Sequence, residues 1–305
     1  MEKWMMASIK TKLTHNFSGL LAALVVASFC VAGGGTVLAQ TNNAVDYVPG
    51  LTQGSAASYA DLAALTERSD LVIRAQIRRQ TKLKPERAPG LAPGFARLYI
   101  EAETRALISG SAPVGESLAY LVDVPLNAKG KVPKLKKREV LLFARPVRGQ
   151  RGAIQLSGNE AQFAYTPELE QRLRPIIRSL LAADAPPVIT GISDALAVPG
   201  TLVGESETQV FLSTDTGAPV SLTVVRRPNQ TPRWGVSWGE IIDSSAQAPS
   251  PDTLRWYRLA CALPESLPSS ANLARDPAAR RLAAQDYAYV IGALGPCERP
   301  ITSAS

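Results

Sequence analysis

The chain has 305 residues, of which 46% are hydrophobic and 19% are charged. This composition is typical of globular proteins and excludes a chain that is disordered throughout, and the length predicts about two domains. The formal charge is +7, with three Cys and a single His.

Residues 1–39 have the pattern of a signal peptide. A basic start precedes an uninterrupted apolar run of 13 residues, Leu20–Ala32. A membrane-spanning helix needs about 18 apolar residues, so this run is short for a permanent anchor. Val37 and Ala39 fit the small-residue positions of a signal-peptidase site and predict a mature chain that begins at Gln40. We therefore expect a periplasmic protein; a secreted protein and one held in the inner membrane by an uncleaved anchor are the alternatives.

Cleavage at that point removes the only His, His15, and all three Met. A mature chain without His has no Ser-His-Asp triad, no Cys-His pair and none of the commonest ligand for zinc and copper. Two cysteines remain, Cys261 and Cys297, and two lone cysteines in an exported chain predict one disulfide. No cofactor is expected, because the sequence contains neither a P-loop nor a G-x-G-x-x-G fingerprint.

The first half of the mature chain predicts a small β-barrel domain over residues 58–165. Residues 40–57 are polar and rich in Gly and Ser, which predicts a flexible tether. A capping box at Ser58–Asp61 predicts a short helix that ends near Arg68. The predicted strands are 70–79, 97–108, 117–124, the apolar and therefore central 139–144, and a hairpin at 153–165 turning at Ser157–Asn159. These strands favour a closed or nearly closed antiparallel barrel.

Three phrases in this domain carry a resemblance: Ser69–Arg74, Leu98–Glu101 and Val140–Phe143. They resemble the OB-like, netrin/TIMP-type domain of exported bacterial proteins, in which a short helix precedes strands of this kind. The resemblance implies an OB-like barrel. TIMP-type inhibition depends on an N-terminal cysteine that chelates the metal of a protease, and a mature chain beginning at Gln40 lacks it. The chain as a whole is similar to exported proteins of Gram-negative bacteria that have no assigned function.

Residues 166–185 predict a connecting helix, with Thr166 as its N-cap and a proline in the first turn. Residues 186–299 predict a second domain, an antiparallel β-meander followed by two helical segments, and residues 300–305 form a tail. The predicted strands are 188–198, 208–213, 220–226 and 234–242, and the helices begin at 250–252 and 276. A disulfide would link the two helical segments. The expected fold class is thus mainly β, of the α+β type.

Two short motifs suggest catalysis but lack its other requirements. Asp215–Ala218 matches the D-T-G-A pattern of aspartic proteases, which need two aspartates sharing a proton, whereas D-T-G between alternating strands is ordinary turn chemistry. Gly235–Gly239 matches G-x-S-x-G, which requires a strand-to-helix turn and a histidine elsewhere. Here Trp234, Val236 and Trp238 alternate onto one face, which predicts a strand with Ser237 on its other face.

Acidic and aromatic residues of the second half offer further candidates. Glu205, Glu207, Glu240 and Asp243 could supply the paired carboxylates of a glycosidase, although acids near turns are usually solvated. No D-x-D-x-D-G calcium loop is present, and no metal site is expected. The aromatic residues Trp234, Trp238, Trp256 and Tyr257 could form a ligand platform, but at these spacings they more often belong to a core.

Charge separates the two halves. Residues 56–165 hold 18 Lys and Arg against 10 Asp and Glu, a net charge of +8, whereas residues 166–305 have a net charge of −2. Six basic residues fall within ten positions, between two predicted barrel strands. These candidate binding residues are Lys129, Lys131, Lys134, Lys136, Lys137 and Arg138. They predict binding of an anionic envelope ligand or an acidic protein surface; a merely solvated loop is the alternative.

The sequence therefore favours a non-enzymatic exported binding protein that acts through its basic OB-like domain. The alternatives are a hydrolase that works with carboxylates alone, of glycosidase or aspartic-protease type, and a two-domain envelope scaffold. Export argues against intracellular nucleic acid as a partner. Membrane contact is expected only if the signal anchor stays uncleaved.

Overall fold

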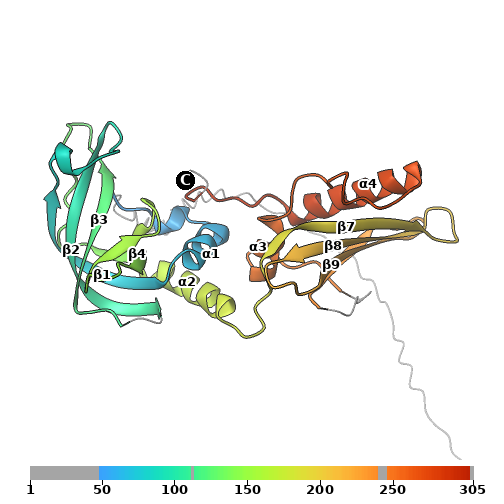
Figure 1. The fold of residues 1–305 in the computed structure, drawn as a ribbon, viewed down its shortest axis with the longest axis horizontal. Coiled ribbons are helices and arrows are strands. Elements are labelled where there is room, and N and C mark those ends of the chain that lie inside the picture. Colours follow the sequence, from blue (N-terminus) through green and yellow to red (C-terminus); the bar gives the residue numbers. More distant parts are fainter. Residues whose placement is uncertain (1–47, 111–112, 240–245, 303–305) are drawn as a thin grey trace, which may run out of the picture. The chain divides into compact units, whose positions relative to one another are not determined.

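The structure is a computed structural model that describes residues 48–110, 113–239 and 246–302. These residues all belong to one unit, Asp46–Ser305. The predicted signal peptide, residues 40–47 of the predicted tether and the last three residues of the predicted tail lie outside the described residues. In the part that is described, the chain is mainly β, with helices on its two antiparallel sheets (Figure 1).

The first sheet is a curled half-barrel in the order β3-β2-β1-β4-β5, with β6 also paired to β4. The register of β1 with β2 shifts at three places, and such bulges increase the local twist of a strand. The strong curl of the sheet follows from this twist. The strands are β1 (Leu71–Lys82), β2 (Phe95–Gly110), β3 (Ser117–Pro125), β4 (Glu139–Pro146), β5 (Ile154–Leu156) and β6 (Gln162–Ala164).

The interior of the half-barrel follows the predicted alternation. On β3, Leu118, Tyr120, Val122 and Val124 are all buried, and they alternate with half-buried or exposed residues. The predicted central position of 139–144 is confirmed, because β4 lies between β1 and the β5 and β6 strands and its middle residues are fully buried.

The predicted hairpin at 153–165 is wrong. β5 and β6 do not pair with each other; both run antiparallel to β4, along the same edge. The chain makes a local turn at Gly158, where the N–H of Ala161 donates to the Gly158 carbonyl, and then continues in its former direction. The turn signal in the sequence was real, but it marks an interruption of one edge strand rather than a reversal.

Two helices flank this sheet in sequence, α1 (Tyr59–Glu67) and α2 (Pro167–Leu180), and short 3-10 turns occur at Gly54–Ala56 and Pro85–Arg87. The predicted capping box at the start of α1 is confirmed: the Asp61 N–H donates to the Ser58 hydroxyl, and the Asp61 carboxylate accepts from the Ser58 N–H. The Thr166 hydroxyl caps α2 by accepting from the Leu169 N–H.

The second sheet is the predicted meander, in the order β10-β9-β8-β7. Its elements are β7 (Ile189–Pro199), β8 (Ser206–Thr214), β9 (Val220–Arg226) and β10 (Arg233–Ser237), followed by α3 (Leu254–Ala260) and α4 (Pro277–Leu294), which packs on β7. The helix predicted to start at 250–252 instead begins at Leu254. Asp252 has a φ of 56°, which no helix allows, and the Thr253 hydroxyl accepts from the Trp256 N–H.

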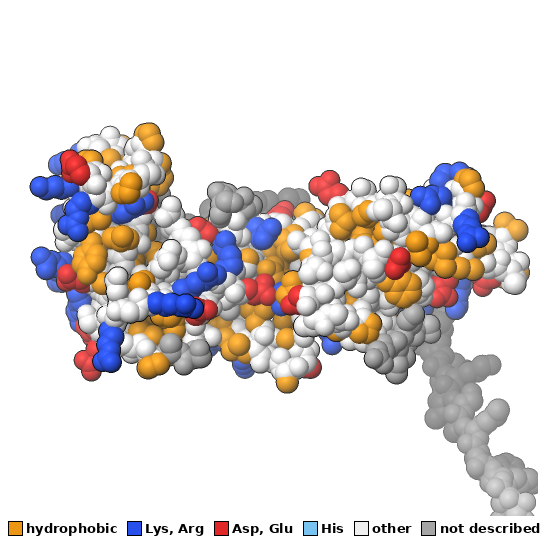
Figure 2. Space-filling view, in the orientation of Figure 1, with side chains coloured by type: hydrophobic (Ala, Val, Ile, Leu, Met, Phe, Trp, Pro, Cys, Tyr) orange, Lys and Arg blue, Asp and Glu red, His pale blue; other side chains and the backbone are white. Residues whose placement is uncertain are grey.

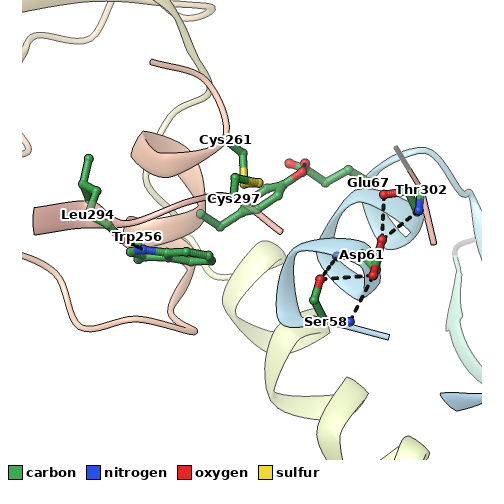
Figure 3. The surroundings of a disulfide bond; sticks show 9 residues. Ser58, Asp61, Glu67, Trp256, Cys261, Leu294, Cys297 and Thr302 are labelled. Atoms are coloured by element: carbon green, nitrogen blue, oxygen red, sulfur yellow. Dashed lines mark hydrogen bonds between the residues drawn. A yellow bond between two sulfur atoms is a disulfide. The ribbon is translucent and has the colours of Figure 1, made fainter. Parts of the chain in front are cut away.

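The predicted disulfide between Cys261 and Cys297 is confirmed, with 5.0 Å between the two Cα atoms (Figure 3). It joins the C-cap of α3 to the segment that follows α4. The bond therefore closes a covalent loop that contains the whole of α4.

Candidate functional site

The six basic residues lie on the connection between β3 and β4, which we call the basic loop (residues 126–138). All six side chains are exposed. In the space-filling view, Lys and Arg side chains gather over the part of the molecule that β1–β4 build (Figure 2). The loop contains no acidic residue. It therefore presents a surface of one charge.

The middle of the basic loop is fixed to the half-barrel by one buried side chain and one amide. Leu135 is fully buried in the half-barrel core. The side-chain amide of Gln80, on β1, donates to the Pro133 carbonyl at 2.8 Å. Its oxygen accepts from the N–H groups of Leu135 and Lys136 at 2.5 and 3.1 Å. Because the backbone is held in this way, the lysines on either side of Leu135 project from a defined position.

Both ends of the loop are also ordered by hydrogen bonds. The Asn127 side chain accepts from the N–H groups of Lys129 and Lys131, at 3.0 and 2.9 Å. At the other end, the backbone N–H of Lys137 donates to the Ile77 carbonyl at 2.7 Å, and Lys137 adopts a left-handed φ of 72°. The run of basic residues in the sequence predicted where the cations lie. The residues that hold the loop in place, such as Gln80 and Asn127, could not be predicted, because they belong to no recognisable sequence pattern.

The cations of the basic loop have no acidic partner. Within the described residues, none of the six side chains forms an ion pair. The acids that border the loop in sequence are engaged elsewhere: Asp123 binds Arg97 with two hydrogen bonds of 2.7 Å, and Glu139 binds Arg74. The hydrogen bond with Glu139 raises the pKa of Arg74 above its ordinary value. The positive field of the loop is thus left uncompensated.

The two catalytic motifs lie where the non-catalytic interpretation predicted them: the first in a turn between strands and the second in a strand. Asp215 is exposed in the turn between β8 and β9, and its carboxylate accepts from the Val188 N–H at 3.1 Å. Ser237 is the last residue of β10, inside a strand rather than at a strand-to-helix turn. Gly235 of the same motif has a steric role, because a Cβ there would collide with the backbone of Ala246.

Among the acids and aromatic residues of the second half, Glu205 and Glu207 line one open pocket of the described chain, whereas the aromatic residues contact the core. Glu205 accepts from the Leu202 N–H, and Glu207 accepts from the Gln209 side chain. Glu240 and Asp243 lie outside the described residues. Of the aromatic residues, Trp256 and Tyr257 are buried, and Trp234 and Trp238 pack against the same core. The core interpretation of these four residues is confirmed.

Sequence reasoning missed a polar network between α1 and α3. Glu67 accepts from the Tyr257 hydroxyl at 2.9 Å and from the Arg258 guanidinium. Burial, with the Glu67 carboxylate as the next cause, raises the pKa of Tyr257 well above its ordinary value. The partners are about 190 residues apart, so no local pattern connects them.

A second missed contact ties the end of the chain to α1. The buried carboxylate of Asp61 accepts from the N–H and the hydroxyl of Thr302 and from the N–H of Ser58 at the start of α1 (Figure 3). It also accepts from the N–H of Ile301. The disulfide lies at the start of that same terminal segment. These contacts fix the segment after α4 and belong to structure rather than to a site.

Among the residues that the structure describes, no helix is long and apolar enough to cross a bilayer. Nor does that part of the chain contain a cluster of three or more His, Cys, Asp or Glu that could hold a metal ion. No protein-family model matches the chain, and no curated protein matches it significantly.

Proposed function

We propose that the protein is an exported, periplasmic binding protein whose basic loop recognises an anionic partner. The half-barrel serves as an OB-like module, over residues 58–165, that presents this loop. The helix at 166–185 joins it to the second domain, residues 186–299. A cleaved signal peptide ending at Ala39 would deliver the chain to a compartment in which the disulfide persists.

One observation carries the proposal: six exposed cations project from an ordered loop with no acidic partner in the described residues. A disordered loop must lose conformational entropy when it binds, whereas the backbone here is already fixed by the buried Leu135 and by Gln80. Clustered charge also raises the rate of association with an anion and makes binding sensitive to salt. The Debye length falls from about 10 Å at 0.1 M salt to about 3 Å at 1 M.

The experiment compares two variants with the same change in net charge. The first replaces Lys134, Lys136 and Lys137 by Gln. The control carries Arg178→Gln, Arg255→Gln and Arg281→Gln, which are exposed residues outside the half-barrel and form no ion pair in the described chain. Binding to dextran sulfate, as a polyanion probe, is measured by calorimetry.

The proposal predicts that the lysine variant binds the probe about tenfold or more weakly, with a smaller salt dependence, while the control binds like the wild type. Both variants should unfold within about 0.5 kcal/mol of the wild type, because all the substituted side chains are exposed. Equal losses in the two variants would show that net charge alone, and not the loop, determines binding.

A further inference from the structure

The strand that leads into the basic loop has backbone groups free to pair. The N–H of Ala119, on β3, donates to the Gly152 carbonyl at 2.8 Å and so points away from β2. Residues two apart along a strand point their backbone groups to the same side. The N–H and C=O groups of Leu121 and Asp123 therefore also point outward, away from their cross-strand neighbours Tyr99 and Arg97.

These outward groups have no partner in the described residues. A single bridge, between Ala119 and Ala153, joins β3 to the chain before β5, and no ladder continues from it. Neither Leu121 nor Asp123 forms another backbone hydrogen bond on this side. An unpaired strand edge of this kind is a template for an added strand.

An open groove of about 1100 Å³ runs along the same edge. Its lining combines residues 119–123 of β3 with residues 153–156, Gly158 and Asn159, and further residues come from β1 and β2. The side chains of Tyr99 and Leu121 are 39% and 49% exposed in it, which gives the groove apolar surface beside the free backbone groups. Such an edge is commonly protected by inward or edge-placed Lys or by Pro, but here Pro125 only ends the strand.

The position of the basic loop indicates the chemistry of the occupant. The loop begins at residue 126, directly after Pro125, and its second part is held against β1 through Gln80 and Ile77. A chain lying along β3 and continuing past its end therefore meets the first part of the loop, which carries Lys129 and Lys131. Of the charged residues that line the groove, Arg97 is paired with Asp123 and Arg79 with Glu101, so the unpaired positive charge in this part of the described chain comes from Arg87. Strand addition uses backbone hydrogen bonds for affinity and alternate side chains for selectivity.

We propose that the edge of β3 binds an extended, acidic segment of a partner protein as an added strand. Its apolar side chains would lie against Leu121 and Tyr99, and its acidic flank would lie along the basic loop. The proposal rests on the proposed function for the acidic character of the segment. The free edge and the groove are independent of it.

The test uses the mature chain and a synthetic peptide of alternating Val and Glu as the probe, with dextran sulfate as a non-peptide polyanion. Amide hydrogen exchange is followed by NMR. Binding of the peptide should slow exchange at Leu121 and Asp123, but change little at Tyr120 and Val122, which already pair with β2. Leu121→Pro removes the outward N–H without breaking the ladder with β2, and Leu121→Thr retains it.

We expect Leu121→Pro to weaken peptide binding about tenfold and Leu121→Thr to leave it nearly unchanged. Equal affinity of the wild type and Leu121→Pro would overturn the proposal, as would slow exchange at Leu121 and Asp123 in the free protein, since the edge would then be covered already. If dextran sulfate binds the basic loop and the peptide does not bind, strand addition is wrong and the proposed function stands. If neither binds, both are wrong. Should Leu121→Pro fail to fold, exchange in the wild type still decides.

Discussion

Replacing Asp61 by Ala should separate the end of the chain from α1 and lower the stability of the whole unit. Asp61 is fully buried, and its carboxylate accepts from three backbone N–H groups, those of Ser58, Ile301 and Thr302, at 3.0, 3.2 and 2.8 Å. It also accepts from the hydroxyls of Ser58 and Thr302. The substitution removes all of these acceptors at once.

The size of the effect follows from the groups left without a partner. A buried donor that loses its acceptor costs about 1–3 kcal/mol. Ser58 and Ile301 are half-buried, so water relieves part of their loss, whereas Thr302 is buried. The free energy of unfolding should therefore fall by about 3–5 kcal/mol in Asp61→Ala.

Two partial substitutions divide this effect. Ser58→Ala removes only the cap of α1 and should cost about 1 kcal/mol. Thr302→Val removes one hydroxyl from the same carboxylate and should cost about 1 kcal/mol. Unfolding in urea gives each value, provided that the slope of free energy against urea concentration stays unchanged. A loss of less than about 1 kcal/mol in Asp61→Ala would show that the carboxylate does not hold the two segments together.

Three further outcomes are expected. Without the disulfide, in Cys261→Ser with Cys297→Ser, the free energy of unfolding should fall by about 4 kcal/mol, because the bond closes a loop with a separation of 36 residues; an unchanged urea midpoint would contradict this. Gly235→Ala should cost about 1–3 kcal/mol through its collision with the covering backbone, whereas Gly191→Ala, with open space around it, should stay within about 0.5 kcal/mol of the wild type in the same assay. Burial raises the pKa of Tyr59 to about 12. The stability that this tyrosine contributes is therefore present below pH about 10 and is lost between pH about 10 and 12. The difference in absorbance titration between wild type and Tyr59→Phe should show a step near 12, and a step near 10 would refute it.

Local patterns predicted most secondary elements because their signals are local. Alternation on β3 and the capping box at Ser58 depend on residues only two or three positions apart. The hairpin expected at 153–165 failed for the opposite reason. Whether a strand reverses at Gly158 or resumes beside β4 is decided by tertiary pairing, and the turn residues are compatible with both.

The candidate site was predicted only in part, for the same physical reason. A run of Lys and Arg can be read directly from the sequence. The groups that order it, such as Gln80 and the buried Leu135, look like ordinary strand and loop residues. The free edge of β3 cannot be predicted from local patterns either, because it depends on the pairing of β5 with β4, which leaves a single bridge between β3 and the chain before β5.

If the basic loop carries the binding surface, a bound polyanion should map onto the backbone of this loop. Amide NMR spectra of the mature chain are recorded during titration with dextran sulfate. The largest shifts should fall on residues 126–138, and residues 186–299 should change little. Shifts centred on the second domain, or spread evenly over all exposed cations, would contradict a binding surface on the loop.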